Sequence, residues 1–114
     1  MSQLLIEPEL RIQNRQGGVK ADGLKLRPTL LLKSMPNAVN AVIKVLDDGA
    51  KKYTVDNWKK VEPERYEDAM LRHTLSYLNG DKHDLDSGSH HLAHAACCIL
   101  FMLELELSNT KIAT

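Results

Sequence analysis

Aromatic residues make up only 4% of this 114-residue chain. That share is too small for the core of a typical β-sandwich or barrel, whereas the plentiful leucine and alanine suit helices. A chain of this length predicts one domain with a modest hydrophobic core. The composition therefore favours a single all-α domain.

An excess of charge of either sign is also missing. Fifteen basic and fifteen acidic residues cancel, so nothing global predicts a nucleic-acid polymer or a membrane surface as partner. The only cysteines, Cys97 and Cys98, are adjacent, which makes a disulfide between them strained. No signal peptide is recognised, and the apolar run Leu92–Leu103 is shorter than a bilayer span. We expect a cytoplasmic protein with two small buried thiols.

Hydrophobic spacing predicts three long helices and no strand. The first begins near Met35, the second at Pro63 with Gly80 as its stop, and the third at His90. The expected caps are Ser34 for the first helix and Ser87 or Ser89 for the third, and Gly49 marks an early end or a kink. The expected buried faces are Val39, Val42, Ile43, Leu46 and Ala50 in the first helix, and Tyr66, Met70, Leu71, Leu75 and Leu78 in the second.

The predicted organisation has three parts. Residues 1–20 form a flexible arm with a short strand or helical turn around Leu4 to Ile12, residues 21–107 form a single all-α domain, and residues 108–114 form a frayed tail. The third helix is apolar nearly all round from Ala93 to Leu103, so it needs neighbours on several sides. We expect self-association as a dimer or tetramer to supply them.

Two groups of carboxylates are candidate metal ligands. Asp81, Asp84 and Asp86 lie in a glycine-containing loop, which suits Mg²⁺ or Ca²⁺ but equally a solvated loop with an Asx cap. The early carboxylates of the second helix, Glu64, Glu67 and Asp68, include an E-x-x-E pair whose side chains converge. That pair suits a divalent metal but also complements the helix dipole.

Basic and histidine residues supply a candidate nucleotide pocket. In "KKYTVDNWKK", four lysines surround Tyr53, Asn57 and Trp58, which combines charge for phosphates with rings that stack on a base. We expect Arg72 to face a carboxylate or a phosphate. His73, His91 and His94 belong either to a pocket or to a satisfied core, while His90 is expected to be a core or exposed residue.

Four segments together resemble a known family: "DGLKLRPTLL", "GAKKYTVDNW", "AMLRHTLSYLNGD" and "DLDSGSHHLAHAACCILFMLEL". From Gly18 to Leu105 they are similar to the phage-encoded dATP/dGTP diphosphohydrolases of N-terminal-domain type, all-α relatives of the MazG-like NTP pyrophosphatases. The resemblance implies an oligomeric helical bundle, a purine deoxynucleoside triphosphate as ligand, and Mg²⁺ or Mn²⁺ as cofactor. It also implies cleavage between the α and β phosphates, giving a monophosphate and pyrophosphate in an infected bacterial host.

Residue pattern and resemblance together assign the site. The expected catalytic residues are Asp84, Asp86, His91 and His94. The expected metal ligands are Glu67, Asp68, Asp81 and Asp84. The expected nucleotide-binding residues are Lys25, Arg27, Lys51, Lys52, Asn57, Trp58, Arg72 and His73.

The chain also departs from the family pattern. Asp81 and Asp86 stand where the family usually carries glutamate, and Asn37 and Asn40 stand where glutamates often occur early in the first helix. Those asparagines motivate an alternative, a protein that binds and sequesters a nucleotide without hydrolysing it, as a phage sponge against nucleotide-signal immunity. The adjacent His83 and Asp84 suggest a third reading, an HD-type phosphohydrolase.

Overall fold

The computed structural model describes the backbone of residues 16–113 and the side chains of residues 16–109. The element predicted around Leu4 to Ile12 lies outside the described residues. The described chain is helical and contains no strand, which confirms the all-α fold. Its elements are α1 (Thr29–Leu32), α2 (Pro36–Lys52), the 3₁₀ turn η3 (Asn57–Lys60), α3 (Pro63–Leu78) and α4 (His91–Ala113).

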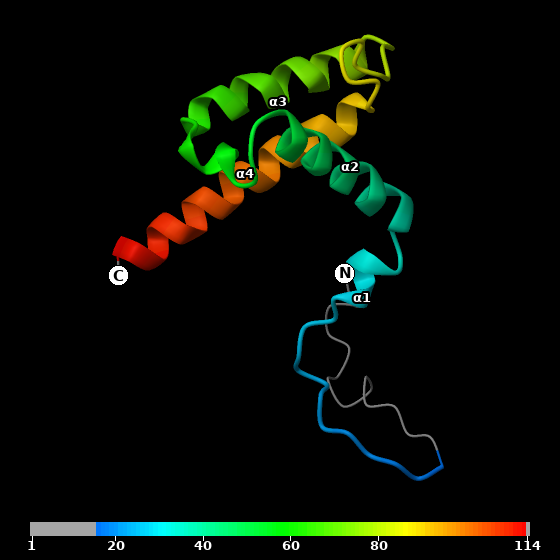
Figure 1. The fold of residues 1–114 in the computed structure, drawn as a ribbon. Helices are drawn as coiled ribbons and strands as arrows, with labels where there is room; N and C mark the ends of the chain where they lie inside the picture. The colour runs from blue at the N-terminus through cyan, green and yellow to red at the C-terminus, as the bar shows by residue number, and fades with distance from the viewer. Residues whose placement is uncertain (1–15, 114) are drawn as a thin grey trace.

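Helix α4 is the central element of the fold. It packs against α2, α3 and η3, and it runs antiparallel to α3 along most of that helix (Figure 1). The short α1 packs against α2, and residues 16–28 lead away from the three long helices (Figure 1). The protein therefore consists of a helical body and an extended segment that precedes it.

Prolines begin two of the helices as predicted. Pro36 opens α2 and Pro63 opens α3, where the fixed φ angle suits a helix and the missing N–H is not needed. The N-cap of α2 is Met35, which makes no side-chain capping bond, so the prediction of Ser34 is wrong. Helix α2 also continues through Gly49 to Lys52, because packing of α2 on α4 outweighs the low helix propensity of one glycine.

The start of α4 differs from the prediction in a way that matters for the site. His90 caps the helix, since its Nδ1 accepts a hydrogen bond from the backbone N–H of Leu92 at 3.0 Å. Neither Ser87 nor Ser89 caps it. The C-terminal end also differs, because α4 continues to Ala113, beyond the expected end at Leu107.

The core is built from small side chains of α4. Ala93, Ala95, Cys97 and Cys98 are buried, and small residues let α2 and α3 approach the central helix closely. Both cysteines are free and buried, as predicted. Burial raises the pKa of the Cys97 thiol to about 11, so this thiol is unreactive at neutral pH.

The buried face of α3 differs in part from the expected one. Tyr66 and Met70 are half-buried as predicted, but Leu71, Leu75 and Leu78 are 49%, 59% and 70% exposed. Tyr66 packs on Phe101 of α4 with ring centroids 5.0 Å apart, and this contact sets the rotation of α3. The rotation turns His73, rather than the leucines, toward α4.

Ile43 of α2 likewise faces outward with 52% of its surface exposed, although the spacing predicts it to be buried. On α4, Ile99, Leu100 and Leu103 are each about half exposed. The body thus presents large apolar side chains on all three long helices. A second copy of the chain would cover such a surface, but self-association remains a prediction.

By length and composition alone, one segment of α4 would also suit a membrane span. His91–Asn109 has a mean hydropathy of 1.4 over 19 residues and is 28% buried. This segment extends beyond the expected apolar run, Leu92–Leu103, at both ends. A single helix of this kind is weak evidence, because the central helix of a bundle has the same composition. The packing of α4 against α2 and α3 accounts for the apolar residues on its buried side, while Ile99, Leu100 and Leu103 remain about half exposed.

The loop between α3 and α4 is folded tightly back on itself. Gly80 and Gly88 have φ angles of +94° and +75°, which residues with a side chain rarely adopt. The backbone N–H of Asp84 donates to the carbonyl of Ser89 at 2.8 Å, and that of His91 donates to Lys82 at 2.8 Å. These bonds fix the loop over the first turn of α4.

Candidate functional site

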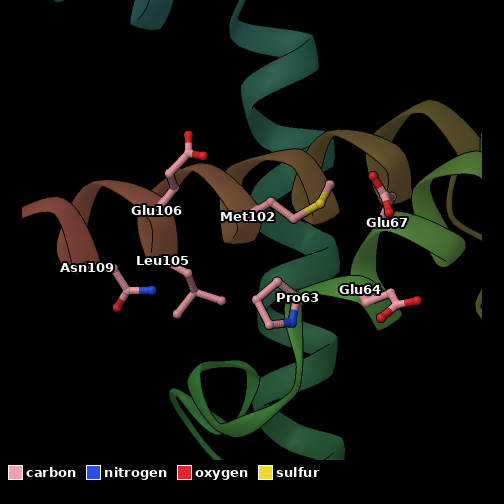
Figure 2. A pocket seen from close by; sticks show the side chains of 7 residues that line it. All are labelled: Pro63, Glu64, Glu67, Met102, Leu105, Glu106 and Asn109. Atoms are coloured by element: carbon pink, nitrogen blue, oxygen red, sulfur yellow. The ribbon is translucent and has the colours of Figure 1, made fainter.

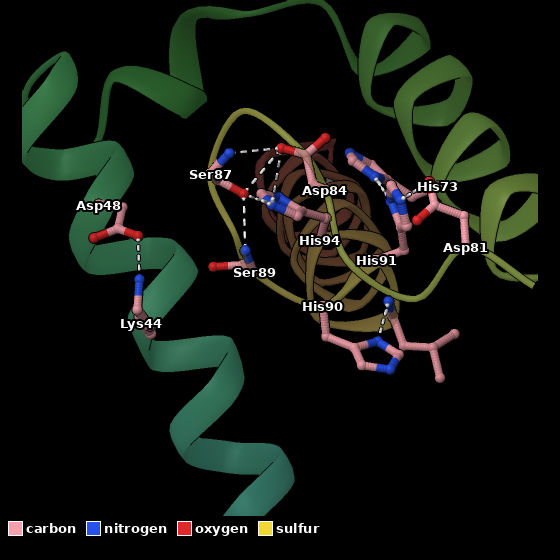
Figure 3. Close-up of polar contacts among 11 residues, drawn as sticks. Lys44, Asp48, His73, Asp81, Asp84, Ser87, Ser89, His90, His91 and His94 are labelled. Atoms are coloured by element: carbon pink, nitrogen blue, oxygen red, sulfur yellow. Dashed lines mark hydrogen bonds and ion pairs between the residues drawn. The ribbon is translucent and has the colours of Figure 1, made fainter.

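Three histidines and one aspartate meet where this loop covers the helix ends. His73 comes from α3, His91 and His94 come from the first turn of α4, and Asp84 comes from the loop (Figure 3). His91 and His94 are three residues apart, so their side chains share one side of α4. The structure therefore brings His73, His91 and His94 together in one cluster, while a role of this cluster in a nucleotide pocket stays a prediction.

The shortest contact in the cluster joins the two helices. Nδ1 of His73 lies 2.8 Å from Nδ1 of His91, so one ring donates a hydrogen bond to the other. On its other side, Nε2 of His91 donates to Oδ2 of Asp81 at 3.2 Å, because an ionised carboxylate only accepts. Neutral His91 then has its proton on Nε2 and a lone pair on Nδ1, and His73 is the donor between the two rings.

A second chain of hydrogen bonds runs through Ser87. Its Oγ lies 2.9 Å from Oδ2 of Asp84, 2.7 Å from Nε2 of His94, and 3.2 Å from the backbone N–H of Ser89 (Figure 3). A hydroxyl has one proton, and the carboxylate of Asp84 needs it. Ser87 therefore donates to Asp84 and accepts from Ser89 and from His94, which places the proton of neutral His94 on Nε2.

Burial and hydrogen bonding set the protonation states. Burial, reinforced by the neighbouring His94 and His91, lowers the pKa of His73 below its ordinary value. Burial also lowers the pKa of His94, against the opposing effect of Asp84. For Asp84 burial acts to raise the pKa, but the backbone and side-chain hydrogen bonds from Ser87 outweigh it and the net pKa is lowered. At neutral pH the imidazoles of His73 and His94 are therefore neutral and the carboxylate of Asp84 is ionised.

Three of these residues can contribute ligands to one metal ion. Single ligand atoms from His73, Asp84 and His91 all lie within 4.8 Å of one another. Two imidazoles and one carboxylate suit Mn²⁺, Zn²⁺ and related metals, whereas Mg²⁺ prefers oxygen ligands alone. Asp81 hydrogen-bonds to His91 on the far side of the ring, the position of a carboxylate that orients a metal-bound histidine.

The other predicted metal ligands lie elsewhere. Glu67 lines a pocket of about 720 Å³ at the opposite end of the α3–α4 pair, with Glu64 and Glu106 at its rim and Met102 and Leu105 among its lining residues (Figure 2). The rise along α3 between Glu67 and His73 is about 9 Å. Asp68 is exposed. The structure therefore groups Asp84 with the histidines and leaves Glu67 in a different pocket.

The neighbours of Asp84 in the sequence do not join the cluster. Asp86 is exposed, and no polar contact of its side chain is found within residues 16–109. His83 packs edge-on against His90 with ring centroids 5.3 Å apart, while the carboxylate of Asp84 turns to Ser87. His83 and Asp84 thus point to different partners, which removes the main support for an HD-type site.

The predicted phosphate-binding residues are scattered. Lys25 and Arg27 lie on the segment that leads away from the body (Figure 1). Lys51 forms an ion pair with Asp47 at 3.0 Å, and Lys52 lies over the ring of Tyr53. One chain therefore does not bring these four basic side chains to the histidine cluster.

The remaining predicted nucleotide contacts have structural neighbours of their own. Trp58 stacks on Phe101 with ring centroids 4.5 Å apart, so it packs in the body and presents at most one ring face to a base. Asn57 is half-buried in η3 beside it. Arg72 is exposed and, within the described part of the chain, pairs with no carboxylate, contrary to the expectation of a protein partner.

Helix α2 contributes two residues that the sequence analysis missed. Lys44 and Asp48 form an ion pair at 2.8 Å on the side of α2 drawn beside the cluster (Figure 3). The hydrogen bond from Lys44 lowers the pKa of Asp48, to which His94 adds a small contribution, and Asp48 in turn slightly opposes the lowering of the His94 pKa by burial. Their i, i+4 spacing in the sequence was a signal for the pair, but not for its position near His94.

Comparisons with known proteins identify the family of the chain. A family model described as dATP/dGTP diphosphohydrolase, N-terminal, matches residues 15–114. A curated relative, a dATP/dGTP diphosphohydrolase of Salmonella phage PMBT28, is 36% identical over 88 residues, which cover 77% of this chain and 29% of that protein. The chain thus spans less than a third of the length of this relative. No solved structure matches the chain. The match over nearly all of its residues shows that the chain belongs to the N-terminal family of dATP/dGTP diphosphohydrolases.

Proposed function

We propose that this protein is a metal-dependent diphosphohydrolase of purine deoxynucleoside triphosphates. One observation carries the proposal: His73, Asp84 and His91 gather potential metal ligands within 4.8 Å of one another in a chain of this family. The reaction is cleavage between the α and β phosphates. The oxygen of a water bonds to the α phosphorus, the bond to the β-phosphate oxygen breaks, and pyrophosphate leaves with the electron pair.

The donor set favours Mn²⁺ over Mg²⁺ as the cofactor. His73, His91 and Asp84 would hold the ion, and Asp81 would orient His91 through its Nε2–H. When bound, such an ion neutralises phosphate charge and lowers the pKa of a water.

His94 is the residue best placed to take the proton of the attacking water. Its Nε2–H is held by Ser87, and no described residue bonds to its Nδ1, which carries the lone pair. The lowered pKa keeps His94 neutral at pH 7, so Nδ1 can accept a proton. Its Nε2 lies 4.0 Å from Oδ2 of Asp84, so the imidazolium formed by the transfer has a carboxylate beside it.

A turnover screen tests the proposal. Purified protein is incubated with each of the four deoxynucleoside triphosphates and Mn²⁺ or Mg²⁺, and the products are separated by chromatography. We expect a monophosphate and pyrophosphate from dATP or dGTP, with faster turnover in Mn²⁺. Asp84→Asn should lose this activity. Glu104→Gln is the matched control, because Glu104 is an exposed carboxylate of α4 that contacts only Ser108 among the described residues.

The same screen tests the alternative. The asparagines at positions 37 and 40 leave the N-terminal half of α2 without a carboxylate, which is the observation that favours a non-hydrolysing nucleotide-binding protein. Nucleotide bound tightly and recovered intact after prolonged incubation with Mn²⁺ would support sequestration and contradict hydrolysis.

A further inference from the structure

Lys25 and Arg27 lie on a segment that has little contact with its own body. Residues 16–28 leave the molecule beyond α1, on the side away from the loop that carries Asp84 (Figure 1). Leu24 and Leu26, which alternate with the two basic residues, are 84% and 95% exposed. We call residues 16–28 the arm. Leucines this exposed are unfavourable in water, so the arm needs a surface to cover them.

The basic side chains of the arm also lack an ionic partner among the described residues. Within the described residues, neither Lys25 nor Arg27 forms an ion pair or a side-chain hydrogen bond. Three lysines of the body, Lys44, Lys51 and Lys59, each pair with an aspartate. The free positive charge near the start of the chain is therefore separated from the histidine cluster, where a triphosphate of about four negative charges requires it.

The body offers a surface that a second copy can cover. Leu71, Leu75 and Leu78 form a stripe along α3, and each is about half exposed or more. Leu78 ends α3 immediately before the loop that carries Asp84. Lys25 and Arg27 lie four and two residues before Thr29, the first residue of α1, so an extended chain carries them about 13 Å and about 7 Å beyond the start of that helix.

We propose that the site is completed in trans: Lys25 and Arg27 of one subunit bind the phosphates of a nucleotide held at the His73–Asp84–His91 cluster of a second copy. The inference rests on the proposed function, because it assigns phosphate binding to residues that one chain keeps apart. Leu24 and Leu26 anchor the arm on apolar surface of the second copy, while the alternating basic side chains reach the triphosphate. The assembly is isologous, since each copy gives an arm and receives one.

Mixing two inactive variants tests the proposal. The arm variant, Lys25→Ala with Arg27→Ala, keeps an intact cluster, and the cluster variant, Asp84→Asn, keeps an intact arm. The two proteins are co-expressed with different tags or mixed under exchange conditions, and dGTP turnover with Mn²⁺ is measured. A competent site needs a cluster from the first variant and an arm from the second, so an equal mixture should regain about one quarter of wild-type activity.

Several controls keep the outcome decisive. Lys33→Ala removes an exposed cation at the C-cap of α1 and should leave turnover unchanged. His73→Gln replaces Asp84→Asn if that variant melts early. Mixtures whose subunits exchange but regain no activity would overturn assembly in trans, as would wild-type protein that is active and monomeric by light scattering. If the wild type binds dGTP without cleaving it, the amount of dGTP bound per chain is measured in the same mixtures in place of turnover. Recovered binding then supports assembly in trans, although the proposed hydrolysis has failed.

Discussion

Nδ1 of His73 lies 2.8 Å from Nδ1 of His91, and this contact joins the middle of α3 to the first turn of α4. Stacking of His73 on His94, with ring centroids 4.5 Å apart and nearly parallel planes, adds a second contact between the same helices. A polar cluster thus occupies one end of the main helix–helix interface. The residues proposed for metal binding therefore also contribute to packing, and variants must be read for both effects.

Asp81 is expected to act through His91 rather than on the substrate. Its carboxylate accepts the Nε2–H of His91 at 3.2 Å, although its own side chain is 61% exposed. Asp81→Asn should weaken Mn²⁺ binding by about 10- to 100-fold, the usual effect of losing a carboxylate behind a metal-bound histidine. The melting temperature without metal should change little, because an exposed polar contact contributes little to stability. Calorimetric Mn²⁺ titration and thermal melts measure the two effects, and Asp81→Glu should restore affinity in part.

Stability should fall as the pH drops below about 6.5. Burial, with smaller contributions from neighbouring groups, gives His73 and His94 lowered pKa values in the folded protein, whereas both take up protons near 6.5 when unfolded. A group with a lowered folded pKa contributes stability above the unfolded value and loses it as pH falls through the folded value. Urea denaturation at pH 7.5 and pH 5.5 should show a lower midpoint at the acid pH. An equal drop in the variant His73→Gln with His94→Gln would assign it to other groups.

Two neighbouring serines should respond oppositely to truncation. Ser87 Oγ has three hydrogen-bond partners, so Ser87→Ala should cost about 1–2 kcal/mol of unfolding free energy and weaken nucleotide turnover. Ser89 Oγ is buried without a partner among the described residues, so Ser89→Ala should be neutral or slightly stabilising. Urea midpoints of the two variants provide the comparison. Equal losses for both serines would contradict the hydrogen-bond assignment.

Trp58 is expected to be a packing residue. It stacks on Phe101 of α4 at 4.5 Å, so Trp58→Ala should lower the unfolding free energy by about 2–4 kcal/mol. Trp58→Phe should retain most of the stability because the stacked ring is kept. Denaturation followed by circular dichroism gives both values. A stable Trp58→Ala protein with selectively weakened dGTP affinity would instead assign the ring to the nucleotide.

The sequence predicted the three long helices because their signals are local. Pro36 and Pro63 mark helix starts directly, and the apolar run of α4 indicates its central position. The rotation of α3 about its axis has no such local signal in the sequence. It follows from the packing of Tyr66 on Phe101 of α4, which leaves Leu71 facing outward. Periodicity alone allowed either face of α3 to be buried.

Which candidate residues lie together was predictable where they share a helix. Spacing on α4 placed His91 and His94 on one side of the helix, whereas the approach of His73 from α3 and of Asp84 from the loop depends on the packing of α3 on α4. The grouping of Glu67 with Asp84 rested on carboxylate density, which carries no information on their positions along α3 and the loop. The three hydrogen bonds of Ser87 Oγ depend on the fold of the loop, so the sequence alone did not predict them.

Metal binding at the histidine cluster is tested most directly by calorimetric titration of Mn²⁺ into wild type, Asp84→Asn and Glu67→Gln. We predict one site per chain in the wild type, loss of that site in Asp84→Asn, and unchanged affinity in Glu67→Gln, whose carboxylate lies in the other pocket. Unchanged affinity in Asp84→Asn together with lost affinity in Glu67→Gln would contradict this account and place the metal at the far end of α3 and α4.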